Sequence, residues 1–292
     1  MRIALYGRGF SPDYDGLMKE VLRILRNAGA ETMVFSSLVN DVRRCNARSA
    51  DYQTFNSYEQ LKGKADILFS FGGDGTMLDS VEYVRDAAIP VLGINMGRLG
   101  FLSSVSADET IETVNKILNG DFEVEERSLL KLVGEEERFN GINYALNELS
   151  VIRKNGSSLI VIHVFVDNKL LNTYWADGLI LATPTGSTAY SLSVGGPIVA
   201  PNNDSFLITP ISAHNLSVRP VVISDKSVVK IKVDGRCDAY DLSLDSRTKL
   251  VDKGLQLEIK KADFSFNMVK LPEKDFFEAI RKKLLWGNDV RN

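Results

Sequence analysis

The first hundred residues alternate short apolar runs with stretches of helical periodicity, and this alternation limits the fold more than any other feature of the chain. Runs that are apolar on both faces are typical of buried parallel strands. The pattern predicts strands at residues 3–6, 32–35, 66–69 and 90–94, with helices at residues 15–27 and 77–88. Strands that alternate with helices in this way indicate a doubly wound parallel sheet.

After about residue 120 the apolar residues recur at every second position instead. Val229, Ile231 and Val233 fall on one face of a predicted strand, and Lys230 and Lys232 fall on the other. The same β character appears at residues 159–166 and 255–260. Short strands of this type, separated by turn signals, predict an antiparallel β-rich domain.

The change of rhythm divides the chain into three parts. We expect an α/β domain at residues 1–105 and a β-rich domain at residues 106–270, which begins with a connecting helix at 108–118. A helix predicted at residues 275–286 belongs to a C-terminal segment, 271–292, which we expect to return to the first domain. The predicted fold class is therefore α/β plus β, with the doubly wound domain first.

Composition excludes several classes of protein. Of the 292 residues, 44% are hydrophobic and 25% are charged, which is the balance of an ordinary globular protein. The net charge of −3 gives no support to nucleic-acid binding, and no apolar run approaches the length of a membrane span. Cys45 and Cys237 are the only cysteines and lie far apart, so we expect no disulfide and a cytoplasmic location.

A glycine-rich turn, Gly72-Gly73-Asp74-Gly75, follows the strand predicted at residues 66–69. Ligands of open α/β sheets bind at this end of the strands, and glycines let backbone N–H groups approach phosphate oxygens. We expect the next helix to begin at Thr76, with Asp79 three residues on completing a capping box. The N-terminus of that helix also favours an anion.

The carboxylate of Asp74 does not fit a simple phosphate cradle, because it repels phosphate. It suits phosphoryl transfer if it accepts a proton from an attacking hydroxyl or helps to hold Mg²⁺. The alternative is a tight turn in which Asp74 only caps the helix. Spacing alone leaves both interpretations open.

A second polar segment occupies residues 177–198. A predicted strand at residues 179–182 enters a turn that is rich in hydroxyl groups and carries no charge. Its hydroxyl residues are Thr183, Thr185, Ser187, Thr188, Tyr190, Ser191 and Ser193. Neutral donors of this kind suit ribose hydroxyls, amides and phosphates, although an ordinary Ser/Thr-rich loop is the alternative. The pair Asn147-Glu148 could bind a ribose or an adenine edge, but alone it is a weak signal.

Other familiar sites lack their residues. The dinucleotide fingerprint fails because Pro12 stands at its third glycine position, and no Walker A loop is present. Two histidines and two separated cysteines supply no ligand set for zinc, and no metal-ligating residues are predicted in the chain.

Taken together, the motifs resemble those of the NAD kinase family. The match rests on Gly72–Thr76, Gly93-Ile94-Asn95, Asn147-Glu148, Asp177-Gly178 and the run Thr183–Tyr190 (T-P-T-G-S-T-A-Y), which is the most specific element. Further matches in the same order are residues 97–102, 195–198, 214–220 and 283–287. The G-G-D-G turn alone also occurs in lipid kinases and phosphofructokinases.

The resemblance implies a phosphofructokinase-like N-terminal domain and ATP-dependent phosphorylation of the adenosine ribose 2′-hydroxyl of NAD, which gives NADP. It implies that Asp74 is the catalytic carboxylate, that Mg²⁺ or another divalent cation accompanies ATP, and that the chain forms a homodimer or homotetramer in which a neighbouring subunit can complete the site. The nucleotide-binding residues that it implies, together with those of the two polar turns, are Gly72, Gly73, Gly75, Thr76, Asn147, Glu148, Asp177, Thr185, Ser187, Thr188, Ala189, Tyr190 and Ser193.

One departure and several alternatives remain. Where the family often has D-S-Q or D-G-Q, this chain has Asp245-Ser246-Arg247, and we assign no site residue there. A lipid kinase of the diacylglycerol type and a non-catalytic NAD sensor are the alternative functions. The sequence also leaves open NAD or NADH as acceptor and ATP or polyphosphate as donor.

Overall fold

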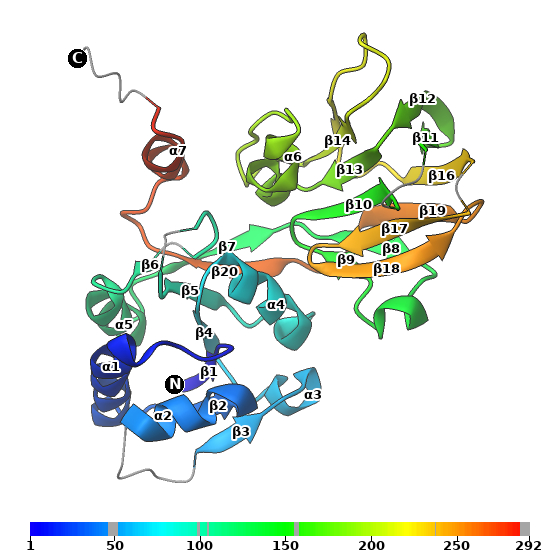
Figure 1. Cartoon of the computed structure of the whole chain (residues 1–292). Coiled ribbons are helices and arrows are strands. Elements are labelled where there is room, and N and C mark those ends of the chain that lie inside the picture. Colours follow the sequence, from blue (N-terminus) through cyan, green and yellow to red (C-terminus); the bar gives the residue numbers. More distant parts are fainter. Residues whose placement is uncertain (46–51, 98–99, 104, 155–157, 237, 287–292) are drawn as a thin grey trace. The chain divides into compact units, whose positions relative to one another are not determined.

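The computed structural model describes residues 1–45, 52–97, 100–103, 105–154, 158–236 and 238–286. Of the residues named above, Arg98, Leu99, Cys237 and Gly287 lie outside these ranges. Contacts within the chain define two compact units (Figure 1). The first unit contains Met1–Glu126 and Phe266–Asn292, and the second contains Arg127–Ser265.

The first unit is built on one sheet whose core strands are parallel. Its strand order is β3-β2-β1-β4-β5-β20-β7, with β6 paired to β5 at the side of this path. The strands are β1 (Arg2–Tyr6), β2 (Glu31–Phe35), β3 (Gln53–Phe55), β4 (Ile67–Phe71), β5 (Val91–Asn95), β6 (Val105–Ser106), β7 (Glu123–Arg127) and β20 (Phe266–Lys270). This arrangement confirms the predicted doubly wound parallel sheet.

Helices cover both faces of this sheet. Successive strand residues point to opposite faces, so strands that are apolar throughout need a covering layer on each side. Ile3 and Leu5 of β1 pack into a core with α1, α2 and α5, whereas Tyr6 contacts Tyr83 of α4. The helices are α1 (Asp15–Asn27), α2 (Val39–Cys45), α3 (Tyr58–Leu61), α4 (Asp74–Val84), α5 (Thr110–Leu118) and α7 (Phe276–Leu284).

Helix α4 begins earlier than the sequence predicted. Asp74 is its first residue and Gly73 is its N-cap, with no side-chain hydrogen bond to the cap. The predicted capping box of Thr76 and Asp79 is therefore wrong: Thr76 lies inside the first turn, and Asp79 pairs with Arg8 instead. The helix also ends at Val84 rather than residue 88, because Arg85 adopts a positive φ of 38°.

The C-terminal residues complete the first unit. Strand β20 lies between β5 and β7 in the sheet and is parallel to β5. Helix α5 packs against α1, and β7 follows it at the sheet edge, so the first unit extends to Glu126. Ion pairs from Glu109 and Lys116 to Lys274 and Glu273 connect α5 to the segment after β20.

The second unit consists of two six-stranded antiparallel sheets, as its period-two sequence pattern predicted. One sheet has the order β15-β14-β13-β10-β17-β18, and the other has the order β12-β11-β16-β19-β8-β9. The first sheet contains β10 (Glu148–Arg153), β13 (Gly178–Ala182), β14 (Ser205–Ile211), β15 (Val221–Ser224), β17 (Ala239–Leu244) and β18 (Arg247–Asp252). The second contains β8 (Leu130–Val133), β9 (Tyr144–Ala145), β11 (Ile160–Val166), β12 (Lys169–Ala176), β16 (Val229–Gly235) and β19 (Gln256–Lys261).

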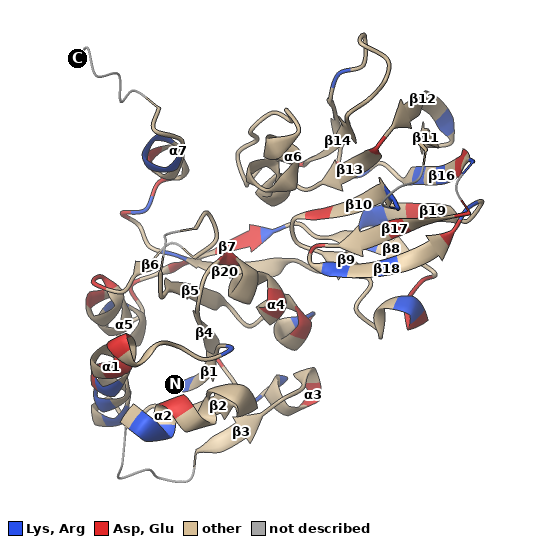
Figure 2. Cartoon of the chain, viewed as in Figure 1, with Lys and Arg blue, Asp and Glu red and all other residues tan. Residues whose placement is uncertain are grey.

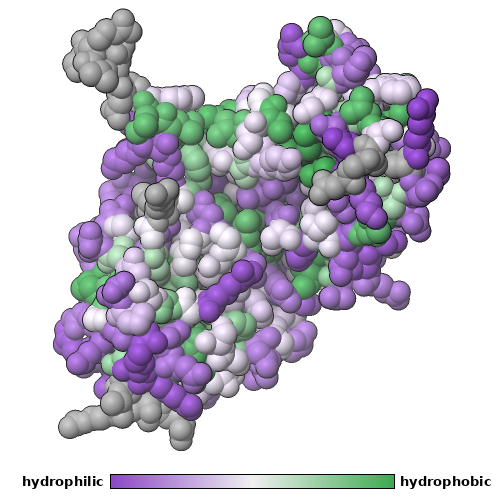
Figure 3. Space-filling view, viewed as in Figure 1, coloured by the Kyte–Doolittle hydropathy of each residue, from purple (hydrophilic) through white to green (hydrophobic). Residues whose placement is uncertain are grey.

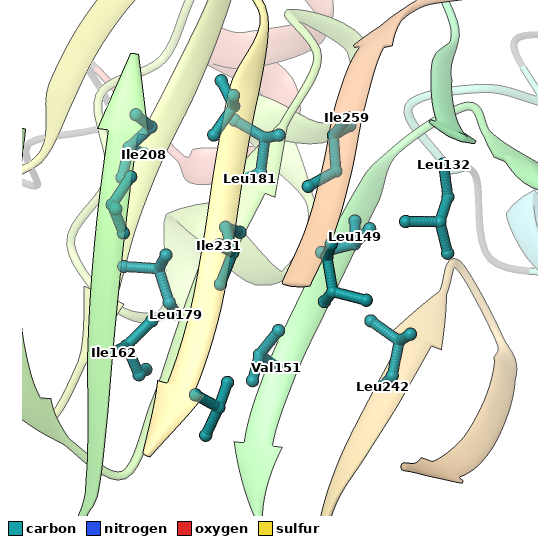
Figure 4. Packing of buried hydrophobic residues seen from close by; sticks show 14 of the residues in the cluster. Leu132, Leu149, Val151, Ile162, Leu179, Leu181, Ile208, Ile231, Leu242 and Ile259 are labelled. Carbon is teal, nitrogen blue, oxygen red and sulfur yellow. The ribbon is translucent and has the colours of Figure 1, made fainter. Parts of the chain in front are cut away.

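The two sheets of this unit enclose one apolar core between them (Figure 4). Leu149, Leu179 and Leu242 come from one sheet, and Ile162 and Ile231 come from the other. On its outer face the first sheet carries a smaller cluster around Ile180 and Leu207, which Val194 and Val199 cover. The polar segment with α6 (Tyr190–Ser193) is thereby fixed against a rigid sheet.

Within the described residues, every helix is too short or too polar to cross a lipid bilayer.

Candidate active site

Asp74 lies where β4 gives way to α4 in the first unit, and its carboxylate is bound by a neighbouring loop. The backbone N–H of Phe101 donates to Oδ2 with an N to O distance of 2.7 Å. The N–H groups of Leu102 and Ser103 both donate to Oδ1, at 3.0 and 2.9 Å. Asp74 therefore does not cap its own helix, as the alternative interpretation held, but is oriented by three consecutive amides.

Two glycines make room for this arrangement. A Cβ on Gly100 would lie 1.8 Å from Asp74 Oδ1, so only glycine leaves the carboxylate in place. A Cβ on Gly72 would lie 2.2 Å from Thr76 Oγ1, which shows how tightly the turn closes on the helix. Glycine is required at both positions because there is no space for a Cβ atom, not because the backbone must be flexible.

The first turn of α4 offers open amides beside this carboxylate. Gly73 and Gly75 are exposed, and no side chain caps the helix. The first N–H groups of a helix have no partner within it, and they carry the positive end of the helix dipole. The turn therefore combines an exposed helix N-terminus with one carboxylate that is fixed by amides.

Lys283 of α7 also lies at this turn, and sequence reasoning did not assign it a role. Its Nζ lies 4.3 Å from the centroid of the Phe101 ring. Burial lowers the pKa of Lys283 to about 8, and the negative charge of Asp74 opposes that shift. Only the sequence match at residues 283–287 pointed to this end of the chain.

In the second unit, the pair Asn147-Glu148 is held by a residue that the sequence analysis left unassigned. The backbone N–H groups of Leu146, Asn147 and Glu148 donate to the Asp245 carboxylate at 2.9, 2.8 and 3.2 Å. Asp245 lies in the two-residue turn between β17 and β18 with a φ of 51°. A buried aspartate thus orients the Asn147-Glu148 turn through three amides, just as the carboxylate of Asp74 is bound by three.

Arg247, the departure from the family pattern, has a structural role in the same place. Its guanidinium donates to the carbonyl oxygen of Ile142 at 2.6 Å and to that of Tyr144. It also lies 3.8 Å from Asp245. Arg247 therefore fixes the chain just before Asn147-Glu148.

The turn at residues 183–187 packs directly on Asn147. The Thr183 N–H donates to the Asn147 carbonyl at 2.9 Å, and the Thr183 hydroxyl donates to the Leu146 carbonyl at 2.6 Å. A Cβ on Gly186 would lie 2.1 Å from the Asn147 carbonyl oxygen. The two sequence motifs of the second unit are therefore one structural cluster.

The hydroxyl groups of this cluster divide into two sets. Ser187 is fully buried and exchanges two hydrogen bonds with the Val199 backbone, and Thr185 is also buried. Thr188 and Ala189 are half-buried, and Tyr190 and Ser193 are exposed. The buried hydroxyls shape the turn, and the Thr188 hydroxyl donates to the Thr185 carbonyl at 3.2 Å. Only Tyr190 and Ser193 of this set are exposed to solvent. Residues 178–203 carry no charged side chain, and α6 is uncharged in Figure 2.

Glu148 is the unusual titratable group of this cluster. Burial, with the charge of Asp245 as a second cause, raises the pKa of Glu148 to about 8, against the effect of a hydrogen bond from the Tyr190 N–H. Its Oε2 is enclosed and has no hydrogen-bond partner within the described residues. Burial raises the pKa of Asp245 as well, but three amides and Arg247 favour its carboxylate. We therefore place the negative charge of the pair on Asp245 and the proton on Glu148.

Asp177 does not join this cluster. It lies at the start of β13, whereas Thr183 lies at the end, and six residues of extended chain span about 20 Å. Its carboxylate accepts a hydrogen bond from Arg153 Nε at 2.5 Å. Of the predicted residues in the second unit, Asp177 alone lies at the far end of the strand.

No group of three or more His, Cys, Asp or Glu side chains is arranged to hold a metal ion within the part of the chain that the structure describes.

Comparisons with known proteins match both units. The ATP-NAD kinase N-terminal domain matches residues 11–122, and the ATP-NAD kinase C-terminal domain matches residues 146–271. The chain belongs to the NAD kinase family. The NAD kinase of Cytophaga hutchinsonii is 39% identical over 292 residues, and that of Flavobacterium johnsoniae is 41% identical over 294 residues. In each case the match covers 100% of both chains.

Solved structures of NAD kinase family members share the fold. Yeast NADH kinase, solved with NADH, is 25% identical with a TM-score of 0.87, and the match covers 100% of this chain and 89% of that one. An NAD kinase from Archaeoglobus fulgidus, solved with ATP, is 24% identical with a TM-score of 0.74 over 98% and 99% of the two chains. Family membership confirms the resemblance found in the motifs and leaves the lipid-kinase alternative without support.

Proposed function

We propose that the chain transfers the terminal phosphoryl group of ATP to the 2′-hydroxyl of the adenosine ribose in NAD, with Asp74 as the catalytic base. Membership of the NAD kinase family gives the overall reaction, the ATP-dependent phosphorylation of NAD to NADP. The observation that carries the role of Asp74 is its carboxylate, fixed by three amides beside the open first turn of α4.

The hydrogen bonds of Asp74 leave one position for a substrate. An ionised carboxylate has about four acceptor sites, two on each oxygen. Leu102 and Ser103 use both sites of Oδ1, and Phe101 uses one site of Oδ2. The remaining site on Oδ2 accepts the proton of the ribose 2′-hydroxyl as the hydroxyl oxygen attacks the terminal phosphorus of ATP, and the bond from that phosphorus to ADP breaks so that ADP leaves. General-base assistance of this kind contributes roughly 10²–10⁴-fold to a rate.

The phosphates of ATP bind at the amides of the glycine turn. The exposed backbone of Gly73 and Gly75 can be approached closely by a phosphate oxygen. The N–H groups of Gly72 and Thr76 donate to the carbonyl oxygens of Ile94 and Gly73, so these two residues shape the turn. The carboxylate of Asp74 accepts three hydrogen bonds from the amides of residues 101–103. These bonds stabilise its negative charge and so reduce its repulsion of phosphates at the same turn.

Mg²⁺ enters with ATP as part of the donor substrate. Mg²⁺ in such sites is held largely by substrate phosphates and water, so it needs no acceptor site on Asp74, whose one remaining site serves the ribose hydroxyl. The ion neutralises charge on the phosphates during transfer.

The cluster of the second unit binds the dinucleotide. Protonated Glu148 has an enclosed oxygen without a hydrogen-bond partner in the described structure, and Asn147 lies beside it. Tyr190 and Ser193 expose a ring and a hydroxyl on a segment without charge. The remaining binding residues that we propose are Thr188 and Ala189, with Thr185 and Ser187 shaping the turn. Neutral groups of this kind suit the ribose and base of NAD or NADH.

Asp177 acts in a second copy of the chain. It lies about 20 Å along β13 from the cluster that binds the dinucleotide, so it does not belong to the same set of contacts. We therefore propose a homodimer or homotetramer in which Asp177 contributes to a neighbouring subunit's site. We also propose a cytoplasmic enzyme, in keeping with a chain that has only two cysteines.

The reaction and the base are tested together. Purified chain incubated with NAD, ATP and Mg²⁺ is expected to produce NADP, and Asp74→Asn is expected to lower kcat by about 100-fold or more while NAD still binds. Turnover close to the wild-type value in Asp74→Asn would exclude the proposed base. Binding of NAD without any formation of NADP by the wild-type chain would favour the alternative of a non-catalytic sensor.

A further inference from the structure

The C-terminal helix α7 carries three consecutive basic residues, and they differ sharply in environment. Lys282 is exposed and pairs with Glu278 at 2.7 Å, one turn earlier. Arg281 is also exposed. Lys283 points the other way: its Nζ is enclosed by protein atoms and makes no hydrogen bond within the described residues.

The ammonium group of Lys283 has only an aromatic ring as a close partner and no close anion. Its Nζ lies over the Phe101 ring at 4.3 Å, and no carboxylate lies within ion-pair distance in the part of the chain that the structure describes. The charge of Asp74 is near enough to favour the ammonium form, but Phe101, Leu102 and Ser103 take three of the four acceptor sites of Asp74, and Lys283 makes no hydrogen bond to the fourth. A partly buried ammonium ion without an acceptor is costly, so its position calls for a ligand.

We propose that Lys283 is a phosphate-binding residue of the Asp74 site, and that its Nζ exchanges the Phe101 ring for a phosphate oxygen of a bound nucleotide. This inference rests on the proposed role of the Asp74 turn in phosphoryl transfer. The face of an aromatic ring attracts a cation less strongly than a charged oxygen does, so the exchange is favourable. The four-carbon stem of lysine gives the Nζ the reach to make it.

The phosphate oxygen has two sources, the triphosphate of ATP and the pyrophosphate of NAD. The geometry favours the triphosphate, because Lys283 shares Asp74 as a neighbour with the open amides of α4. Separate titrations of the two nucleotides distinguish the sources.

A purely structural role for Lys283 makes the opposite prediction for stability. If the Phe101 contact anchors α7, then Lys283→Met weakens the fold. If the residue is kept for a ligand, then methionine, which packs on Phe101 without an enclosed charge, leaves the Tm unchanged or raises it. Under the proposal, Lys283→Met therefore keeps or raises the Tm while it lowers the affinity for the nucleotide.

The experiment compares the full-length wild-type chain with Lys283→Met, Lys283→Arg and the matched control Lys282→Met. MgATP, NAD and inorganic tripolyphosphate are titrated one at a time by calorimetry, so no turnover occurs, and the Tm is measured for each variant. We expect Lys283→Met to weaken MgATP and tripolyphosphate by roughly tenfold or more. Lys283→Arg should restore most of the affinity, and Lys282→Met should bind like the wild type.

The outcomes separate clearly. A loss confined to NAD assigns Lys283 to the pyrophosphate of the acceptor, and a loss for both nucleotides assigns it to a shared position. Unchanged affinity for both nucleotides in Lys283→Met overturns the proposal. So does an equal loss in Lys282→Met, a loss that arginine does not restore, or a loss accompanied by a lower Tm. Because the titrations contain one substrate each, they decide this point whether or not Asp74→Asn abolishes turnover.

Discussion

At the scale of single residues, the carboxylate of Asp74 is positioned more by its neighbours than by its own helix. Three amides from one loop fix both oxygens, and Gly100 leaves the space in which the carboxylate lies. The sequence indicated that this aspartate was special, because a carboxylate conflicts with a phosphate-binding turn. It did not indicate the partner loop, since nothing local in the chain connects positions 74 and 101.

We predict that Gly100→Ala inactivates the enzyme without unfolding it. The new Cβ would lie 1.8 Å from Asp74 Oδ1, and rotation of that side chain relieves the clash at the expense of the amide bonds. We expect kcat to fall by about 100-fold with little change in Tm. Gly97→Ala is the matched control, because its Cβ would lie 3.9 Å from Asn95 Oδ1. Steady-state kinetics of the two variants measure the difference; normal turnover in Gly100→Ala would contradict this account.

Glu148 makes the stability of the fold depend on pH. Its pKa is about 8 in the folded chain, against an ordinary value of 4.5, so the folded state keeps a proton that the unfolded state releases. This group therefore stabilises the fold fully below about pH 4.5, and the contribution is lost as the pH rises through about 8.

We predict that Glu148→Gln flattens this part of the stability profile. Glutamine cannot ionise, so the difference in unfolding free energy between variant and wild type should shift in favour of the variant between pH 5 and 9. Urea unfolding at a series of pH values measures that difference. Parallel profiles for the two chains would show that Glu148 does not hold a proton in the folded state.

At the scale of elements, the hairpin of β17 and β18 organises the turn before β10. The two-residue loop places Asp245 in a left-handed conformation, and its side chain then receives three amides from Leu146, Asn147 and Glu148. The hydrogen-bonded residues Leu146 and Asp245 are 99 positions apart. Periodicity revealed the strands of this region, but it carries no information on which loops meet at their ends.

We predict that Asp245→Asn loosens the Asn147-Glu148 turn. An amide side chain has one acceptor oxygen, so its NH₂ group would face a backbone donor in a buried place. We expect a loss of about 1–3 kcal/mol in unfolding free energy and a larger loss of affinity for NAD than for ATP. Denaturant titration and single-substrate binding measure the two effects. Asp238→Asn, with a side chain that is 99% exposed, is the control and should change neither quantity.

The elements themselves were largely predictable, and their ends were not. Apolar runs located β1, β4 and β5, and alternation located β11, β16 and β19. Helix α4 was predicted from its apolar stripe, yet its start at Asp74 depends on the glycine turn rather than on a capping side chain. The pairing of β20 with β5 joins residues about 170–180 positions apart, so no local pattern could have indicated it.

At the scale of the whole molecule, the far position of Asp177 makes a prediction about assembly. If a second copy supplies this residue, then Asp74→Asn and Asp177→Asn affect different subunits of one site. The two inactive variants are refolded together or co-expressed in equal amounts, so that about half of the dimers are mixed. One of the two sites in each mixed dimer is intact, so about a quarter of the wild-type activity should return. Recovery is measured as NADP formed per chain. No recovery in mixed dimers, verified by differently tagged chains, would place Asp177 outside any shared site.

Several large apolar side chains remain exposed on the surface of the described structure. Leu216, in the loop between β14 and β15, has an exposed fraction of 89%. Phe277 of α7 is also exposed, as are Leu285 and Trp286, which directly follow this helix. Apolar surface is visible in the region of α7 in Figure 3. Composition alone predicted only a globular class, because it does not report which apolar residues remain outside the core.

The insertion of β20 between β5 and β7 has a consequence for how the protein is made. While the ribosome is still producing the second unit, the first unit lacks an interior strand of its sheet, and β7 has no place beside β5. The unit that carries Asp74 can close only after residue 270 has emerged, although strand β1 is synthesised long before strand β20. A nascent chain therefore contains the residues of the glycine turn early, but it can form the complete sheet behind them only after β20 has been synthesised.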